Sequence, residues 1–408
     1  EPFDGGQSPI KPCGAVADIR NQIMGPQPEP AEMRRWAWQA AAHGARAVLH
    51  ARWRTPLRGI GQLNCGLLDQ DGFGRDRYKE ARRIGGEFFN IAPALGKATV
   101  SPCVAILRDC DQLWSCELQP AAPDFDYDQY CFEIYGIIRR LGHNCHFAGA
   151  ATDWTGYTVL IAPALRVVDV ELLDKFSAFI KEGGVVVFTP QSGTRTSFNA
   201  LHPSTSPGLL LELVGAMVQE VRPLYGRSET IAFSRGGLIA QRCDVTGWTE
   251  VLECLKAEAL AEYSEGRLAG KPVISRREYG LGHAIYMGAH LPPETMRIFL
   301  ADILPRARVR SVPEGVEVTE RSLEDKRFLF ILNHRNERAL ITIEEAAVDI
   351  ISGEKVGPEI RPAPNGVLLL EYEVVDALTY KPSAKKTQAA PAAGAKEGGQ
   401  EPARRLTD

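Results

Sequence analysis

The sequence predicts an α/β protein made of the closing segment of a parallel β/α barrel, a doubly wound domain and a small antiparallel β-sandwich. Residues 33–89 read as helix, strand, Gly-rich loop and helix, which is the unit from which such a barrel is built. Residues 103–303 alternate short apolar strands with amphipathic helices, as in a sheet covered on both faces. From residue 305 the apolar period becomes two, which indicates antiparallel strands.

The first region, residues 1–98, carries the barrel-like elements. Apolar residues at helical spacing predict a helix over 33–43, with Pro30 near its start and Gly44 able to take the left-handed conformation that ends it. Residues 45–53 (ARAVLHARW) are too few for another helix and are predicted to form a buried strand. After an exposed loop, a second helix is expected over 75–89.

Three regions follow: a doubly wound domain over 99–304, a β domain over 305–381 and a disordered tail over 382–408. The middle domain is of the flavodoxin or glutamine-amidotransferase type. Its expected strands are CVAIL, TVLIAPAL, VVVFT and HAIYMGAH, and its expected helices cover 130–141, 170–181 and 292–303. In the β domain the strands VEVTE, RFLFIL, ALITI and GVLLLEY are predicted.

Other chemistries of the doubly wound fold are disfavoured. An amidotransferase needs a Cys in a Gly-x-Cys-x-Gly turn after a strand, but VVVFT leads into PQSGTRT, where Ser192 lacks a glycine two residues before it. No GxGxxG follows the first strand, which argues against a dinucleotide site. Asp124, Asp126 and Asp128 lack the Gly and distal Glu of a calcium loop and fit a helix N-terminus better. We expect no metal site.

Composition excludes several classes of partner. The net charge is −4 and basic residues form no stripe, which argues against nucleic acid. No apolar run approaches the ~18 residues of a membrane span, and no signal-peptide pattern opens the chain. Nine cysteines without a CxxC pair fit a reducing compartment, so the cytoplasm is the expected location.

The motifs resemble a known family in chain order. WAWQAAAHGA, ARWR and GLLDQDG resemble the last barrel segment of the β-galactosidases of glycoside hydrolase family 42. VAILRD, IYGIIRRLGH, YTVLIAPAL and FIKEGGVVVFTPQSG are similar to that family's trimerisation domain, and VEVTERSLEDKRFLFILNHRN resembles its C-terminal domain. The resemblance implies retaining hydrolysis of terminal β-D-galactosides by two glutamates, without a cofactor, in a homo-oligomer that could be a trimer.

The resemblance assigns the catalytic residues only in part. EPFDGGQSP is similar to a stretch that opens with the nucleophile in one branch of the family, so Glu1 is the candidate nucleophile. The acid/base glutamate lies on an earlier barrel strand and has no counterpart here. A typical barrel takes roughly 250 residues, so most of it is absent from this chain.

The resemblance also locates candidate sugar contacts in the barrel loop. Where the family usually has Glu, two residues and His, this chain has Gly61 to Asn64, so Gln62 and Asn64 are left to bind hydroxyl groups without a charge. Trp53 could stack on a sugar face or belong to the core. Arg54 could orient a carboxylate or tie down the loop.

Two residues of the second domain complete the candidate set. Asp109 and Trp114 follow the first strand, at the edge where open α/β sheets place binding sites. The resemblance implies that this domain makes subunit contacts and that Trp114 leans towards a neighbouring active site. Two functions therefore remain open: a β-galactosidase-like hydrolase present as a C-terminal portion, and a non-catalytic oligomerisation or sugar-binding module.

Overall fold

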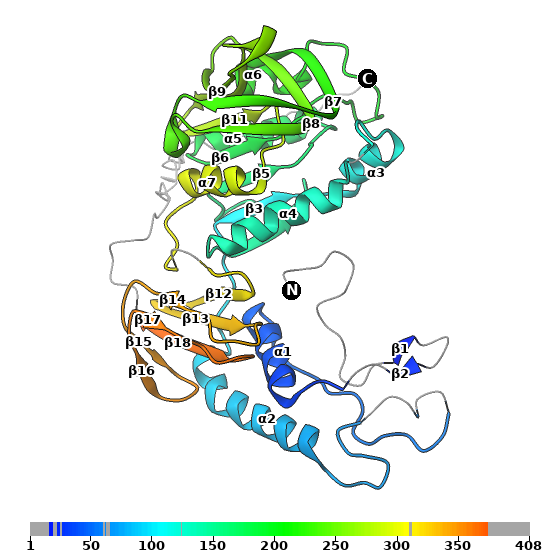
Figure 1. Ribbon diagram of the computed structural model, residues 1–408, viewed down its shortest axis with the longest axis vertical. Coiled ribbons are helices and arrows are strands. Elements are labelled where there is room, and N and C mark those ends of the chain that lie inside the picture. The colour runs from blue at the N-terminus through cyan, green and yellow to red at the C-terminus, as the bar shows by residue number, and fades with distance from the viewer. Residues whose placement is uncertain are drawn as a thin grey trace, which may run out of the picture. The chain divides into compact units, whose positions relative to one another are not determined.

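The computed structural model describes residues 16–18, 23–24, 27–59, 62, 66–123, 125–309 and 312–373 (Figure 1). The predicted tail at 382–408 lies outside these residues. Two short strands, β1 (Val16–Asp18) and β2 (Ile23–Met24), form an antiparallel pair near the start.

Two helices form the body of the N-terminal part. α1 (Pro30–Ala42) has Pro30 in its first turn, and Glu29 and Glu32 form a capping box that satisfies backbone N–H groups at the helix start. The predicted start is therefore confirmed. α2 (Asp76–Leu95) continues past the predicted end at residue 89, because Ile91 and Leu95 extend its buried face.

These helices share a hydrophobic core with the C-terminal β domain. Trp38 of α1 is fully buried, and its ring centroid lies 4.6 Å from that of Phe88 on α2 and 6.4 Å from that of Phe330 on the sheet. Phe328 and Leu369 of the same sheet belong to this cluster. Parts that are far apart in the sequence therefore bury one another's apolar faces.

The middle domain is built on one nine-stranded sheet, in the order β4-β3-β5-β6-β11-β10-β9-β7-β8. Its strands are β3 (Val104–Leu107), β4 (Cys145–Ala148), β5 (Val159–Ala162), β6 (Val185–Phe188), β7 (Ala216–Phe233), β8 (Arg242–Cys254), β9 (Glu258–Tyr263), β10 (Pro272–Tyr279) and β11 (Gly282–Met287). Its helices are α3 (Cys110–Leu118), α4 (Tyr127–Arg140), α5 (Val170–Lys181), α6 (Leu211–Val214) and α7 (Pro293–Ile303).

The sheet is parallel only in its first half. β3, β5, β6 and β11 pair in parallel, as predicted, and so does β4, which was not predicted; β10, β9, β7 and β8 pair antiparallel. The sequence analysis missed this extension. The long strand β7 has an irregular burial pattern, with four exposed residues in succession, and breaks register with β8 twice, so it carries no continuous apolar run.

Helices cover both faces of the parallel half, which is the doubly wound arrangement. One apolar cluster joins α4 and α7 to one face, and another joins α5 to the opposite face. Asp109, Asp126 and Asp169 each begin a helix and accept a hydrogen bond from a backbone N–H within its first turn. The predicted role of Asp126 as a helix N-terminus is confirmed, while Asp124 lies outside the described residues.

The C-terminal part is a small antiparallel domain. A five-stranded sheet has the order β12-β13-β18-β15-β16, and β14 pairs with β17 beside it. The strands are β12 (Val316–Leu323), β13 (Lys326–Asn333), β14 (Ile341–Thr342), β15 (Ala347–Asp349), β16 (Glu354–Val356), β17 (Glu359–Ile360) and β18 (Val367–Glu373).

Arg321 of β12 connects this sheet to the ends of both N-terminal helices. Its side chain is buried and donates to the carbonyl oxygen of Ala41 at 2.9 Å, of Leu95 at 3.4 Å and of Ala98 at 3.1 Å. The last carbonyl groups of a helix have no partner within the helix and carry partial negative charge. One guanidinium therefore satisfies the C-terminal ends of α1 and α2 together.

Glu317, on the same strand, gathers polar groups from three elements. Its carboxylate accepts from Gln39 at 2.8 Å and contacts His43, both at the end of α1, and it lies 3.5 Å from Arg139 of α4 and 3.1 Å from His334. Burial alone would raise the pKa of Glu317, but hydrogen bonds from the two histidines and the charge of Arg139 hold it well below its usual range. The carboxylate is therefore ionised and fully paired.

We predict that Arg321→Met lowers the free energy of unfolding by about 3 kcal/mol, because it removes charge-assisted hydrogen bonds and leaves buried carbonyl groups without donors. Urea denaturation followed by circular dichroism measures this change. Arg338 is exposed and makes one bond, at 3.3 Å to the Arg361 carbonyl oxygen, so Arg338→Met should stay within about 0.5 kcal/mol of wild type. Equal losses in the two variants would contradict the capping role of Arg321.

Candidate functional site

The loop between α1 and α2 carries most of the predicted sugar contacts. Among the described residues, the backbone of 52–55 pairs with residues 67–68, through Leu67 N to Arg52 O at 2.8 Å, Leu68 N to Trp53 O at 2.8 Å and Thr55 N to Leu68 O at 3.0 Å. The predicted strand over 45–53 was wrong for the described residues. A strand needs a ladder of partners, and this segment finds one only at its end.

Trp53 and Arg54 stand next to each other on this loop. Trp53 is 63% exposed and meets Tyr78 edge to face, with ring centroids 5.9 Å apart. Arg54 donates from Nη2 to the carbonyl oxygen of Gln70 at 2.6 Å and thereby holds the following turn. Tying down the loop, one of the two interpretations of Arg54, describes the contact that its guanidinium makes here.

The turn at 69–75 is organised by ion pairs. Arg75 Nη2 lies 2.7 Å from Asp71 Oδ2, and both Arg75 and Arg77 contact Asp69. The hydrogen bond from Arg75 lowers the pKa of Asp71. Both carboxylates therefore pair with arginine side chains at the start of α2.

Gln62 closes its own turn. Its Nε2 donates to the carbonyl oxygen of Gly59 at 3.0 Å, and the side chain is exposed. Asn64 and Glu1 lie outside the described residues. The structure therefore groups Trp53, Arg54 and Gln62 on one loop and does not test their roles.

Asp109 and Trp114 lie in the middle domain, on α3. Asp109 Oδ1 accepts from Gln112 N at 3.1 Å, so its carboxylate serves as the helix cap, and burial raises its pKa. Trp114 is 55% exposed. The pair lies at the C-terminal edge of the parallel strands, as predicted.

The crevice usual for this fold is filled by side chains. Gln112 bonds both backbone groups of Val167 at 2.9 Å, and Arg166 donates to the carbonyl oxygens of Ser115 and Gln119 at 2.8 Å. Gln112 and Arg166 are buried. The space where such sheets bind ligands is therefore occupied by the protein itself.

Ser192 is not accessible to a substrate either. It is fully buried, and its hydroxyl donates to the carbonyl oxygen of Thr189 at 2.7 Å. A nucleophile must reach substrate and a base. This geometry supports the exclusion of amidotransferase-type chemistry at Ser192.

Sequence reasoning missed a buried carboxylate next to this edge. Glu250 of β8 accepts from Gln191 N at 2.9 Å and Trp248 Nε1 at 3.0 Å on one oxygen, and from Tyr286 OH at 2.8 Å on the other. Despite these three donors, burial raises the pKa of Glu250 to about 6. A Glu at an inward-facing strand position is the signal that could have identified Glu250 from the sequence. It was missed because the strand β8 was not predicted.

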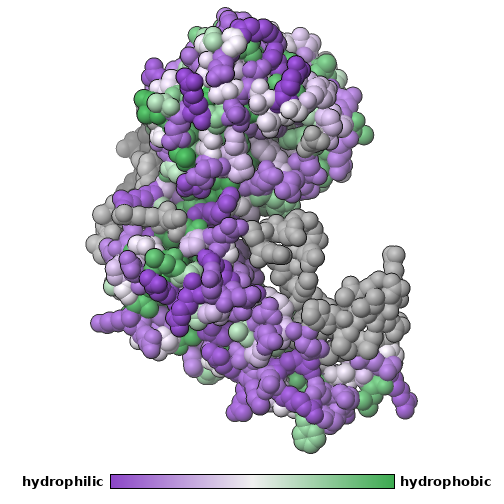
Figure 2. Space-filling view, in the orientation of Figure 1, coloured by the Kyte–Doolittle hydropathy of each residue, from purple (hydrophilic) through white to green (hydrophobic). Residues whose placement is uncertain are grey.

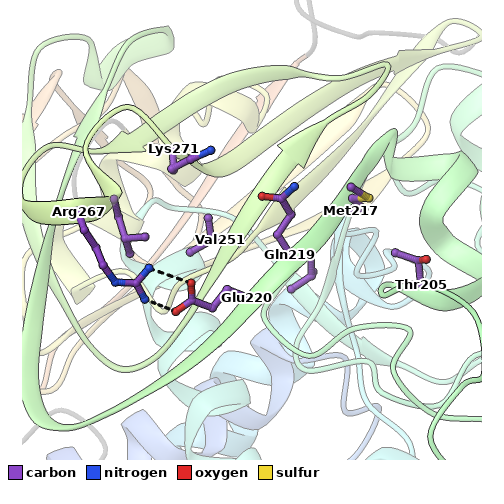
Figure 3. Close-up of a pocket in the computed structure, with 9 residues that line it drawn as sticks. Thr205, Met217, Gln219, Glu220, Val251, Arg267 and Lys271 are labelled. Atoms are coloured by element: carbon purple, nitrogen blue, oxygen red, sulfur yellow. Dashed lines mark hydrogen bonds and ion pairs between the residues drawn. The ribbon is translucent and has the colours of Figure 1, made fainter.

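An open cleft of about 580 Å³ lies on the antiparallel side of the sheet (Figure 3). Glu220 and Arg267 face each other across it, with Arg267 Nη1 3.2 Å from Glu220 Oε2, and Arg222 also donates to Glu220 at 2.9 Å. Leu268 and Val251 form a buried floor. Because Glu220 is held by two guanidinium groups, the cleft offers no carboxylate free for acid or base catalysis.

In the part of the chain that the structure describes, no helix is long and apolar enough to cross a bilayer. Nor do three or more His, Cys, Asp or Glu side chains of that part of the chain converge as metal ligands would.

Three segments of this chain match, in the same order along the sequence, segments of one known protein family. Residues 103–310, about half of the chain, match the family segment described as the β-galactosidase trimerisation domain. Residues 14–91 match the β-galactosidase segment, and residues 315–371 match the β-galactosidase C-terminal domain. The chain belongs to glycoside hydrolase family 42.

Relatives of this family 42 chain are named as β-galactosidases. Bga of Halorubrum lacusprofundi is 32% identical over 378 residues, which cover 86% of this chain and 53% of that protein. BgaH of Haloferax lucentense is 29% identical over 332 residues, covering 81% and 48%. The chain spans about half the length of the curated relatives it matches.

Solved structures agree on the fold. The β-galactosidase from Halorubrum lacusprofundi superposes with a TM-score of 0.71 at 33% identity, covering 86% of this chain and 51% of that one. The β-galactosidase from Bacillus circulans sp. alkalophilus has a TM-score of 0.77 at 24% identity, covering 84% and 52%. The antiparallel extension and the C-terminal β domain thus belong to an arrangement seen in family 42 structures.

The raised pKa of Glu250 predicts that the contribution of this side chain to the free energy of unfolding depends on pH. The folded state holds the proton more tightly than the unfolded state, so this group favours folding most below pH 4.5 and loses that contribution as the pH rises through about 6. Relative to wild type, Glu250→Gln should gain roughly 2 kcal/mol of unfolding free energy between pH 4.5 and pH 8, since 1 pKa unit is ~1.4 kcal/mol.

Urea denaturation of both proteins at the two pH values measures this difference. Gln keeps an acceptor for Gln191 N and Trp248 Nε1, and the Tyr286 hydroxyl can accept from the new amide, so the variant should fold. A stability difference that does not change with pH would show that Glu250 titrates alike in folded and unfolded chains.

Proposed function

We propose that this chain is the C-terminal portion of a retaining β-galactosidase that hydrolyses terminal β-D-galactosides. The observation that carries the proposal is the succession of three family 42 segments in order, in a chain half as long as the β-galactosidases it matches. In this reading the loop with Trp53, Arg54, Gln62 and Asn64 faces the sugar. Glu1 is the candidate nucleophile, and the acid/base carboxyl comes from outside this chain.

Retention requires two carboxyl groups roughly 5 Å apart, one attacking the sugar and one moving the proton. Among the described residues, the buried carboxylates considered above are engaged elsewhere: Glu317 by histidines and arginine, and Glu250 by three donors inside the middle domain. This supports assigning the chemistry to the barrel and leaves the middle and C-terminal domains with a supporting role.

We assign the regions as barrel closure at 1–98, oligomerisation domain at 99–304, β domain at 305–381 and tail at 382–408. The partners would be a carbohydrate substrate and further copies of the chain, with a trimer as the proposed assembly and neither nucleic acid nor membrane involved. A cytoplasmic location is proposed because the seven cysteines among the described residues are all free thiols.

A second candidate is an oligomerisation or sugar-binding module without turnover. The observation that favours it is the loop itself, where Gln62 turns its amide to Gly59 and neutral side chains replace the family's charged pair. Neutral hydrogen bonds are about half as strong as charge-assisted ones. Such a loop would hold a sugar weakly.

Isolation of the native protein from its source organism separates the two candidates. We expect a mass well above the 44.8 kDa of this chain and hydrolysis of a chromogenic β-galactoside, with the matched α-galactoside as control. Proton NMR should show β-galactose as the first product, because two displacements preserve the configuration. A native species of 44.8 kDa that binds galactose without hydrolysing the glycoside would instead establish the binding module.

The aromatic platform can be tested in the same active protein. Trp53→Ala should lower kcat/KM for the β-galactoside about fivefold, mainly through KM, because the ring contributes roughly 1 kcal/mol of stacking. Phe73→Ala removes another exposed ring, 71% accessible, from the same loop and serves as the matched control. Equal kinetics in both variants would place Trp53 away from the sugar.

A further inference from the structure

The turn that follows β6 has two features of a nucleophile elbow. It leaves the end of a parallel strand directly, and Gln191 takes the left-handed backbone conformation, with φ at 73°. Residues other than glycine rarely adopt this conformation, and those that do cluster at active sites. In enzymes with such an elbow, the nucleophile stands on this turn with a glycine two residues after it. Gly193 meets that spacing here, so the nucleophile position belongs to Gln191 and not to Ser192.

A histidine follows the neighbouring strand. β11 pairs with β6 in parallel, and His290 comes shortly after the end of β11. Its ring centroid lies 5.2 Å from that of Phe125 and 4.6 Å from that of Tyr130. Among the described residues, neither His290 Nε2 nor Gln191 Nε2 has a hydrogen-bond partner, although both atoms are buried. Since buried polar groups are normally paired, two such groups at neighbouring strand ends indicate a ligand site.

The carboxylate of Glu250 lies against this turn. Its Oε1 accepts from Gln191 N at 2.9 Å and from Trp248 Nε1 at 3.0 Å, and its Oε2 accepts from Tyr286 OH at 2.8 Å. These three donors, from the turn after β6, from β8 and from β11, are called the carboxylate cradle below. Elbow enzymes use backbone N–H groups of this kind to bind the negative oxygen of the substrate. Here a side chain of the protein takes that donor.

The antiparallel half of the sheet brings Glu250 to this place. β8 returns to the end of β11, because Glu250 N donates to Gly288 O at 2.6 Å and Thr249 forms an antiparallel bridge with Ala289. On β9, Tyr263 OH donates to the carbonyl oxygen of Glu250 at 3.1 Å. The backbone of Glu250 is therefore fixed while its side chain meets the ends of the parallel strands. The extension of the sheet thus closes a ligand position of the parallel half.

The carboxylate cradle is enclosed by the protein. Glu250 and Tyr286 are each 1% exposed, and Gln191 is 5% exposed. The face drawn in Figure 2 is mainly hydrophilic, as expected when polar groups stay in water. A carboxylate buried away from water is costly unless hydrogen-bond donors surround it. The cradle supplies such donors from three separate elements.

We propose that the carboxylate cradle is a ligand site whose occupant is the protein's own Glu250, held where an elbow enzyme holds an oxygen of its substrate. The ligand class of the site is a short monocarboxylate. Glu250→Ala deletes a CH2–COO⁻ group, which has the shape and charge of acetate, so free acetate should enter in its place. The site is independent of the proposed β-galactosidase reaction, because its residues belong to the middle domain.

Urea denaturation of the full chain with Glu250→Ala tests the site, in sodium acetate and in sodium chloride of equal ionic strength. At about ten times the Kd found by titration, acetate should raise the folding equilibrium constant about tenfold, because it binds the folded chain alone. Pivalate carries the same charge on a bulkier group and should act as chloride does. Wild type and Glu250→Gln, whose side chains fill the cradle, should respond to acetate no more than to chloride.

The proposal would be overturned by a Glu250→Ala protein that gains nothing from acetate. Equal effects of acetate and pivalate, or an acetate response in wild type, would also overturn it, because they would show a general effect of anions. If the alanine variant folds in neither solution, Trp248→Phe decides, since it keeps Glu250 and removes one donor. NMR of an isotope-labelled carboxyl group should then show the pKa of Glu250 above its wild-type value of about 6. An unchanged pKa would overturn the cradle.

Discussion

The buried guanidinium of Arg321 holds together parts of the chain that are separated by more than two hundred residues. It reaches from β12 to the ends of α1 and α2, where helix carbonyl groups are without partners. The hydrophobic core beside it packs Trp38 against Phe330, and burying those carbonyl groups there without donors would cost free energy. The polar contact therefore lowers the cost of forming the apolar one.

This arrangement gives the C-terminal β domain a role although no chemistry was found in it. The loop with Trp53 leaves the end of α1 and enters α2, and both helices rest on the sheet through Arg321 and Trp38. Glu317 adds a second tie to α1 through Gln39 and His43. A sugar-facing loop would therefore be positioned by residues that contact no sugar.

The sequence predicted those elements whose local pattern matches their environment. α5 was found at its observed bounds because Asp169 caps it and its buried residues Leu172, Phe176 and Ile180 follow helical spacing. The strand over 45–53 was predicted from the same kind of pattern and does not form, since a strand depends on partners elsewhere in the chain. β7 and β8 were missed because their burial is irregular. Arg321, Glu317 and Glu250 were missed because each acts through residues far away in sequence.

The middle domain shows how a fold with a ready-made ligand crevice can serve another purpose. Gln112 and Arg166 fill the crevice with bonds to backbone groups, so the strand ends are rigid and closed. Two other bonds, from Arg166 to Gln191 and from Ser115 to Asn199, tie this region to the loop after β6, and Trp114 on α3 and Phe198 on that loop are exposed. Rigid backbone lowers the ordering cost of association. The bonds that fill the crevice and the bond from Ser115 to Asn199 thus hold the backbone on which Trp114 and Phe198 are exposed.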